Sequence, residues 1–150
     1  MPMMTEIASG LGFPEGPVAM SDGSVVIVEL TRGTLTRVLP DGARQVVAET
    51  GGGPNGAAVG PDGRIYICNN GGVRLTADGQ PTGDAPEDYA GGYIQRVDLV
   101  SGKTEVLYAG CNGHHLRGPN DLVFDASGGF WLTDMGKLQG RQIHRGAVDY

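Results

Sequence analysis

The chain lacks helical periodicity, a disulfide framework and any excess of basic charge. No stretch of twelve or more residues keeps an apolar stripe at helical spacing, so helices are not expected. The two cysteines, Cys68 and Cys111, do not make a disulfide framework, and Cys68 is expected to be a small buried apolar residue. With 17 acidic and 11 basic residues the formal net charge is −6, which argues against a nucleic-acid partner.

Targeting and membrane-spanning segments are missing as well. The opening residues, Met1-Pro2-Met3-Met4-Thr5-Glu6, lack the basic and apolar regions of a secretory signal, and no apolar run has transmembrane length. A soluble cytoplasmic protein with no membrane partner is therefore expected. A Gly-x-Ser-x-Gly elbow, a glycine-rich phosphate loop and a zinc-spaced cysteine–histidine set are also absent from the sequence.

Glycine is abundant, and short apolar runs lie between the glycine-rich turns. The chain has 27 glycines and 9 prolines, and 39% of its residues are apolar, which predicts an all-β protein. One segment occurs three times, at 13–28, 53–68 and 118–133, and the copies align without gaps. In each copy a proline stands eight residues before an Asp-Gly or Ser-Gly pair, which predicts two strands joined by a tight turn.

Further strands follow each hairpin. Third strands are predicted at 33–38, 92–98 and 146–150, and fourth strands at 44–48 and 104–109. The first two copies lie 40 residues apart, a spacing typical of four-stranded antiparallel propeller blades. The sequence therefore predicts a β-propeller.

We interpret residues 1–150 as one partial propeller domain with repeats that start near 13, 53 and 118. The second and third copies are 65 residues apart, so about 25 residues are inserted, and 71–92 is expected to form a long loop. The third repeat has no fourth strand, which indicates a truncated chain or a part that assembles with a complement. Unclosed strand edges favour self-association.

Three polar residues hold the same place in the three copies. Each copy has a proline at the same position, and the residue after it is Glu15, Asn55 or Asn120. In a propeller this position lies at the start of the strand nearest the axis. One carboxylate and two amide oxygens are hard ligands that suit Ca²⁺ or Mg²⁺. The alternative is that each asparagine only makes a turn, with its side chain bonded to the local backbone.

Two of these segments resemble a known family. Phe13-Pro14-Glu15-Gly16-Pro17 and Arg117-Gly118-Pro119-Asn120-Asp121 are similar to motifs of the senescence-marker-protein/gluconolactonase (SMP-30/LRE-like) family, and the resemblance extends from about 10 to 150. It implies a six-bladed propeller with a divalent cation in its channel, of which this chain supplies about two and a half blades. Ca²⁺ is the first candidate, with Mg²⁺, Zn²⁺ and Mn²⁺ as alternatives.

The resemblance also implies roles for single residues. Glu15 matches a metal ligand, and Asn120 matches an asparagine that faces the cation or the substrate. Arg117 falls near a position that binds sugar-acid hydroxyls, although here it precedes Asn120 by three residues instead of two. Asn55 is a candidate for substrate binding by its place in the repeat. The remaining ligands, an asparagine and a catalytic aspartate, would lie beyond Tyr150.

The implied reaction is the hydrolysis of a small lactone assisted by a divalent cation. His115 is a candidate general base, since an unperturbed imidazole titrates near neutral pH; the alternative is that His114 and His115 form a surface pair. Two other functions stay open: phosphotriester hydrolysis on the same scaffold, and a non-catalytic propeller that binds a partner.

Overall fold

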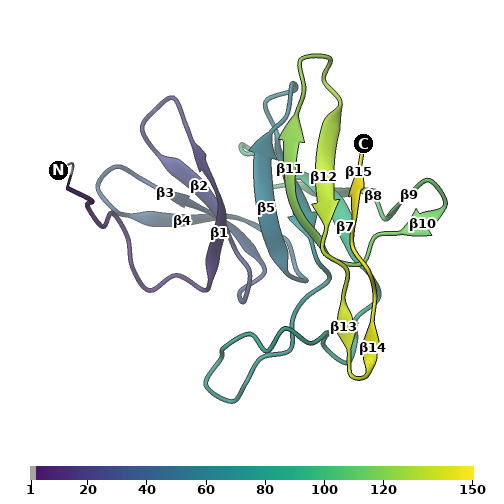
Figure 1. The fold of residues 1–150 in the computed structure, drawn as a ribbon. Helices are drawn as coiled ribbons and strands as arrows, with labels where there is room; N and C mark the ends of the chain where they lie inside the picture. The colour runs from purple at the N-terminus through teal and green to yellow at the C-terminus, as the bar shows by residue number, and fades with distance from the viewer. Residues whose placement is uncertain (1–2) are drawn as a thin grey trace.

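The computed structural model describes residues 3–150, and within them the chain forms fifteen β-strands and no helix (Figure 1). All ten ladders between named strands in this part of the chain are antiparallel. The predicted all-β, antiparallel class is therefore confirmed. No helix in the described part of the chain is long and apolar enough to cross a membrane.

The first sheet contains four strands in chain order: β1 (Pro14–Ala19), β2 (Val25–Glu29), β3 (Thr34–Val38) and β4 (Arg44–Glu49). A tight turn joins β1 to β2. Asp22 accepts a hydrogen bond from the Ser24 N–H at 3.0 Å, and Gly23 takes a φ of +82° that favours glycine. The turn joins β1 to the valine- and isoleucine-rich strand β2 in one hairpin, as the repeat predicts.

The second sheet repeats this order with β5 (Pro54–Val59), β6 (Ile65–Asn69), β7 (Tyr93–Val97) and β8 (Thr104–Tyr108). Residues 70–92 connect β6 to β7 and contain no named strand. A single antiparallel bridge between Leu75 and Pro81 closes the outer part of this connection. The long segment therefore leaves the sheet and returns without disturbing the pairing of β6 with β7.

The third sheet consists of β11 (Pro119–Phe124), β12 (Phe130–Asp134) and β15 (Ala147–Asp149). Two small hairpins were not predicted: β9 (Gly110–Cys111) with β10 (His114–His115), and β13 (Leu138–Gln139) with β14 (Gln142–Ile143). Each strand of these hairpins has two residues, which is too short for an alternating apolar pattern to be recognised.

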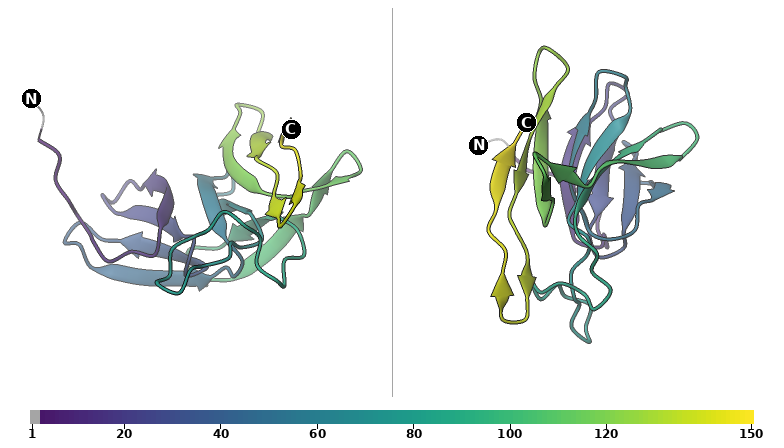
Figure 2. Two further views of the ribbon diagram at one scale, coloured as in Figure 1. Left: turned by 60° about the horizontal axis from the view of Figure 1, so that its bottom comes forward. Right: turned by 90° about the vertical axis from the view of Figure 1, so that its right-hand side faces the viewer.

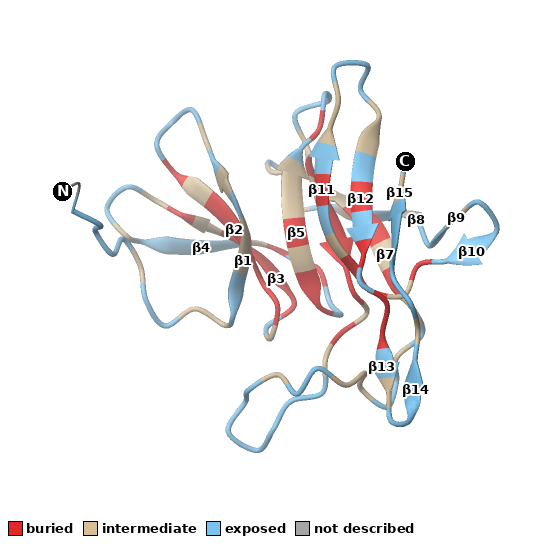
Figure 3. Ribbon diagram, in the orientation of Figure 1, coloured by how far each residue is buried: buried red, intermediate tan, exposed pale blue. Residues whose placement is uncertain are grey.

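Two apolar clusters fill the spaces between the sheets (Figure 3). The first packs Val26, Val28 and Leu35 against Ile65, Ile67 and Val97. The second packs residues of the second sheet against Leu116, Leu122 and Leu132, with an aromatic group beside them. Cys68 is buried in this cluster, as predicted, and burial raises the pKa of its thiol.

The three sheets follow one another side by side, and the first strand of each is the innermost (Figure 2). β5 contacts β1 on one side and β11 on the other. The connections between second and third strands, 30–33, 70–92 and 135–146, all lie at the end of the sheets where the first strands begin. This common end, called the mouth below, holds the candidate site.

Candidate functional site

Glu15, Asn55 and Asn120 are each the second residue of an innermost strand. All three are half-buried. In every case the ladder to the neighbouring strand shifts register at this point: directly after Glu15 in the first sheet, and across Asn55 and Asn120 in the other two. Such bulges release a residue from regular pairing and redirect its side chain, and they are common beside functional sites.

Glycines let these strands approach one another closely. A Cβ atom on Gly16 would lie 2.6 Å from the backbone nitrogen of Ala57, and one on Gly56 would lie 2.5 Å from the carbonyl oxygen of Asn120. Neither position can therefore carry a side chain without moving the backbone. The beginnings of β1, β5 and β11 consequently lie against each other, which brings the segments that carry Glu15, Asn55 and Asn120 together at the mouth.

A buried polar residue ends the second strand of each sheet and holds the loop before the first strand. Glu29, Asn69 and Asp134 face Pro14, Pro54 and Pro119 in the ladders. The Glu29 carboxylate accepts a hydrogen bond from the Gly12 N–H at 2.6 Å, and the Asn69 amide oxygen accepts one from the Gly53 N–H at 2.9 Å.

Asp134 binds more backbone N–H groups than Glu29 or Asn69 does. Its carboxylate accepts hydrogen bonds from the backbone N–H groups of Arg117 at 2.6 Å, Gly118 at 2.7 Å and Gly136 at 2.8 Å. Its side chain is only 7% exposed. We call Glu29, Asn69 and Asp134 the latch residues, because each fixes the backbone that leads into a candidate site residue.

Burial and hydrogen bonding act in opposite directions on Glu29. Burial raises the pKa of its carboxyl group, but the Gly12 N–H, the Thr36 hydroxyl and the Arg32 guanidinium outweigh it, so that the pKa lies below its ordinary value. The carboxylate is thus the stable form in the folded protein, and it remains an acceptor for the loop that leads to Glu15.

A pocket of about 420 Å³ opens at the mouth beside Asn55. We call it the mouth pocket; its walls come from the residues before β1 and β11 and from the two inserted connections 70–92 and 135–146. Its polar side chains are those of Asn55, Asn70, Lys137 and His144. Its larger apolar side chains are Phe13, Leu30, Val73, Pro81, Met135, Leu138 and Ile143.

Lys137 ties the two inserted connections together. Its ammonium group donates to the Asn70 carbonyl at 2.8 Å, to the Asn70 side-chain oxygen at 3.3 Å and to the Gly72 carbonyl. The same group lies 5.1 Å from the centre of the Tyr89 ring. Burial lowers the pKa of Lys137 to about 8, and the negative charge of Asp134 opposes this decrease.

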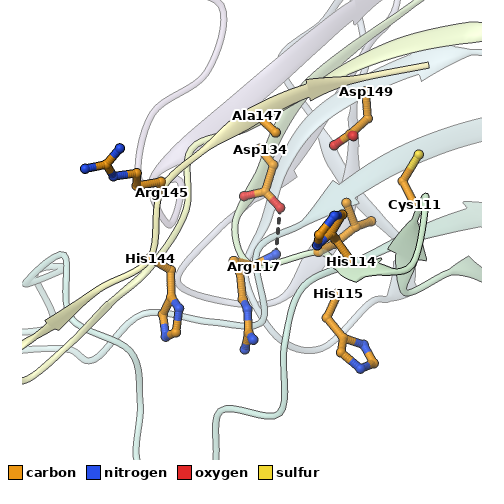
Figure 4. A pocket seen from close by; sticks show the side chains of 10 residues that line it. Cys111, His114, His115, Arg117, Asp134, His144, Arg145, Ala147 and Asp149 are labelled. Carbon is orange, nitrogen blue, oxygen red and sulfur yellow. Dashed lines mark hydrogen bonds between the residues drawn. The ribbon is translucent and has the colours of Figure 1, made fainter.

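A second pocket of about 310 Å³ lies between the β9–β10 hairpin and β15 (Figure 4). We call it the side pocket. Its polar lining includes His115, Arg117, Asp134, His144 and Arg145. Figure 4 shows Arg117 and His144 extending in the same direction while Arg145 points away. His114 and His115 are exposed, as a surface pair would be.

Of the predicted site residues, three line these two pockets, whereas Glu15 and Asn120 line neither. Asn55 lines the mouth pocket, together with Phe13 and Gly118, which precede Glu15 and Asn120 by two residues. His115 and Arg117 line the side pocket. His144, which the sequence did not single out, lines both pockets.

The donor groups at the mouth suit a hard cation. No cluster of three histidine, cysteine, aspartate or glutamate side chains occurs within residues 3–150, so a cation at the mouth would take most of its ligands from amide or backbone oxygens beside the single Glu15 carboxylate. The Asn120 amide nitrogen contacts the Met135 sulfur at 3.5 Å, which leaves the amide oxygen available as a ligand. An anionic oxygen with amide oxygens is the kind of donor set that Ca²⁺ binds.

Sequence reasoning missed the latch residues Glu29 and Asn69 and also Lys137. A signal for the first two was present, because Glu29, Asn69 and Asp134 occupy one position, directly after the aligned copies, and all three are polar at the end of an apolar strand. Lys137 gave no comparable signal. Its burial depends on how the connections 70–92 and 135–146 pack against each other, and neither connection has a repeating sequence pattern.

Known proteins resemble this chain in fold. A gluconolactonase from Xanthomonas campestris superposes with a TM-score of 0.62 at 24% identity, covering 83% of this chain and 35% of its own. A virginiamycin B lyase from Staphylococcus aureus superposes with a TM-score of 0.58 at 15% identity, covering 93% of this chain and 42% of its own. These neighbours, with the repeated four-stranded sheets, define a propeller-type fold.

The family follows from the sequence match. The family described as the SMP-30/gluconolactonase/LRE-like region matches residues 13–148, and the chain belongs to this family. A gluconolactonase from Zymomonas mobilis is 27% identical over 142 residues, which are 85% of this chain and 35% of that protein. The chain thus spans about a third of the length of this relative.

Proposed function

We propose that this protein hydrolyses small lactones with the help of a divalent cation held at the mouth. The observation that carries the proposal is the equivalent placement of Glu15, Asn55 and Asn120 at the start of three adjacent innermost strands. Family membership supports it, as does the resemblance to gluconolactonases. Ca²⁺ is the first candidate, and Mg²⁺, Zn²⁺ and Mn²⁺ are the alternatives.

In this proposal Glu15 and Asn120 supply oxygen ligands to the cation, and Asn55 contacts the substrate. A bound cation would polarise the lactone carbonyl and lower the pKa of a water molecule. Ca²⁺ takes six to eight oxygens, so Glu15 and Asn120 account for only part of its coordination and further oxygens must complete it. The latch residues keep the strand beginnings in place, so that these ligands do not have to be ordered when the cation binds.

His115 and Arg117 keep separate roles in this proposal. Both line the side pocket and not the mouth pocket. Arg117 would reach a substrate that extends from the mouth past Gly118. His115 would act as a base only on a substrate bound in the side pocket, because a general base must lie within hydrogen-bond reach of the proton that it removes.

Calorimetric titration of Ca²⁺ into the chain tests this proposal. We expect Ca²⁺ binding that weakens at least tenfold in Glu15→Gln, which removes the charge and keeps the shape. Glu6→Gln is the matched control, since Glu6 is exposed in the segment before β1 and should have no effect. Binding that Glu15→Gln leaves unchanged would refute the metal assignment, and no binding of any of the four cations would favour a propeller used for recognition.

Self-association is proposed on a separate observation. Val26 and Tyr66 hold equivalent places in the first two copies, and each packs against the next sheet. The third copy has Trp131 at this place, and its side chain is 49% exposed beside the exposed Val123 and Val148. We propose that two copies of the chain associate through this face of the third sheet.

A further inference from the structure

Most of the side chains that line the mouth pocket are apolar, and this composition affects which lactones can bind there. Phe13, Leu138 and Ile143 are exposed large apolar side chains, and all three belong to its lining. Exposed apolar side chains that gather around a concavity, rather than scatter over a surface, are typical of a ligand site. A volume of about 420 Å³ is suited to a small molecule.

Three of the four polar side chains of this pocket have a partner inside the protein. The Lys137 ammonium donates to three oxygens of Asn70 and Gly72. The Asn70 side-chain oxygen also accepts from the Gly72 N–H at 2.9 Å. One ring nitrogen of His144 pairs with the Gln139 side chain at 3.0 Å. Of the four polar side chains, Asn55 alone makes no hydrogen bond to another described side chain or backbone group within residues 3–150.

These pairings make the pocket a poor host for a polyhydroxylated ring. Each sugar hydroxyl that leaves water needs a partner, and a buried hydroxyl without one is strongly unfavourable. Within residues 3–150 the Asn55 amide, the Asn70 NH₂ group and one His144 ring nitrogen make no hydrogen bond, and these groups are too few for the hydroxyls and the ester of a sugar lactone together. An alkyl or aromatic substituent, in contrast, gains from every methylene that it buries.

We infer that the mouth pocket selects lactones that carry an alkyl or aromatic substituent over lactones of sugars. The inference rests on the proposed lactone hydrolysis and adds the class of substrate. The substituent lies against Phe13, Leu138 and Ile143, and the ester ring lies toward Asn55 and the strand beginnings that carry Glu15 and Asn120. Lys137 has the supporting role of holding the two inserted connections in contact, so that the apolar wall keeps its shape.

Binding without turnover tests this selection. Saturation-transfer NMR and calorimetry on the chain would compare γ-nonalactone with γ-butyrolactone, which lacks the alkyl chain, and with ribonolactone, which carries hydroxyls. Each buried methylene improves affinity by roughly fourfold, so γ-nonalactone should bind at least tenfold more tightly than either of the others. Ile143→Ser and Leu138→Ser should each weaken γ-nonalactone binding by roughly threefold to tenfold.

The control variant is Val100→Ser, which changes an apolar side chain that is 98% exposed in the turn between β7 and β8 and should leave binding unchanged. Ribonolactone binding as tightly as γ-nonalactone would overturn the inference. So would γ-nonalactone binding that neither pocket variant weakens. Selective binding of γ-nonalactone without hydrolysis in the presence of any cation would refute the proposed function and leave the inference intact. Hydrolysis of ribonolactone without binding of γ-nonalactone would do the reverse.

Discussion

Replacing Asp134 by alanine removes one side chain and leaves three backbone N–H groups without their acceptor. The hydrogen bonds from Gly118 and Gly136 are fully buried, and that from Arg117 is partly buried. A buried donor that loses its partner costs about 1–3 kcal/mol, so the two buried groups together suggest a loss of about 2–6 kcal/mol in the free energy of unfolding. That is a large fraction of the stability of an ordinary domain.

Asp134→Asn separates the effect of the acceptor from that of the side chain's bulk. An amide keeps one oxygen for the Gly118 and Gly136 N–H groups, which both contact Oδ1, but it places an NH₂ group against the Arg117 N–H. We expect a loss of about 1–2 kcal/mol for this variant, since a single donor is left unpaired. The order of stability should therefore be wild type, Asp134→Asn, Asp134→Ala.

Urea unfolding followed by circular dichroism measures these differences as shifts of the midpoint at constant slope. Asp125→Ala is the matched control. The Asp125 carboxylate also accepts backbone N–H groups, from Ser127 and Gly129, but at a turn near solvent where water replaces the lost acceptor. An Asp134→Ala variant that loses no more stability than Asp125→Ala would refute the idea that the latch residues fix the mouth.

Two further predictions concern Lys137 and Trp131. The pKa of Lys137 is about 8 in the folded chain against an ordinary 10.5, so between these pH values the unfolded state binds more protons than the folded state does. The contribution of Lys137 to stability therefore rises with pH across that window. Urea midpoints measured from pH 7 to 10.5 should rise less steeply in Lys137→Met than in the wild type, and parallel curves would contradict the low pKa. Trp131→Ser should lower the weight-average mass seen by analytical ultracentrifugation, whereas Val100→Ser should not; an equal mass in wild type and Trp131→Ser would exclude this face as the contact.

The strands of the sheets could be predicted from the sequence, but the loops that form the walls of the mouth pocket could not. Apolar runs and turn glycines repeat at fixed positions, so strands such as Thr34–Val38 and Tyr93–Val97 could be placed to within a residue. The position of Asn55 at the mouth followed from the same repeat. The mouth pocket could not be foreseen, because it depends on contacts between 70–92 and 135–146, whose residues follow no period.

The latch residues show why the repeat predicts some features and not others. Pairing of Asn69 with Pro54 across the ladder is a local consequence of strand register and can be read by aligning copies. The choice of glutamate, asparagine or aspartate at that position depends on what surrounds it. Thr36 and Arg32 bind the Glu29 carboxylate, and no alignment of the repeats contains that information.

The connections between second and third strands differ in length from sheet to sheet, at 30–33, 70–92 and 135–146, while the ladders that flank them keep their register. Insertions and deletions at this one point reshape the mouth without touching the apolar clusters between the sheets. Evolution can therefore change the ligand preference of such a scaffold by altering loops alone, and a designer who grafts new connections there should obtain new pockets on an unchanged fold.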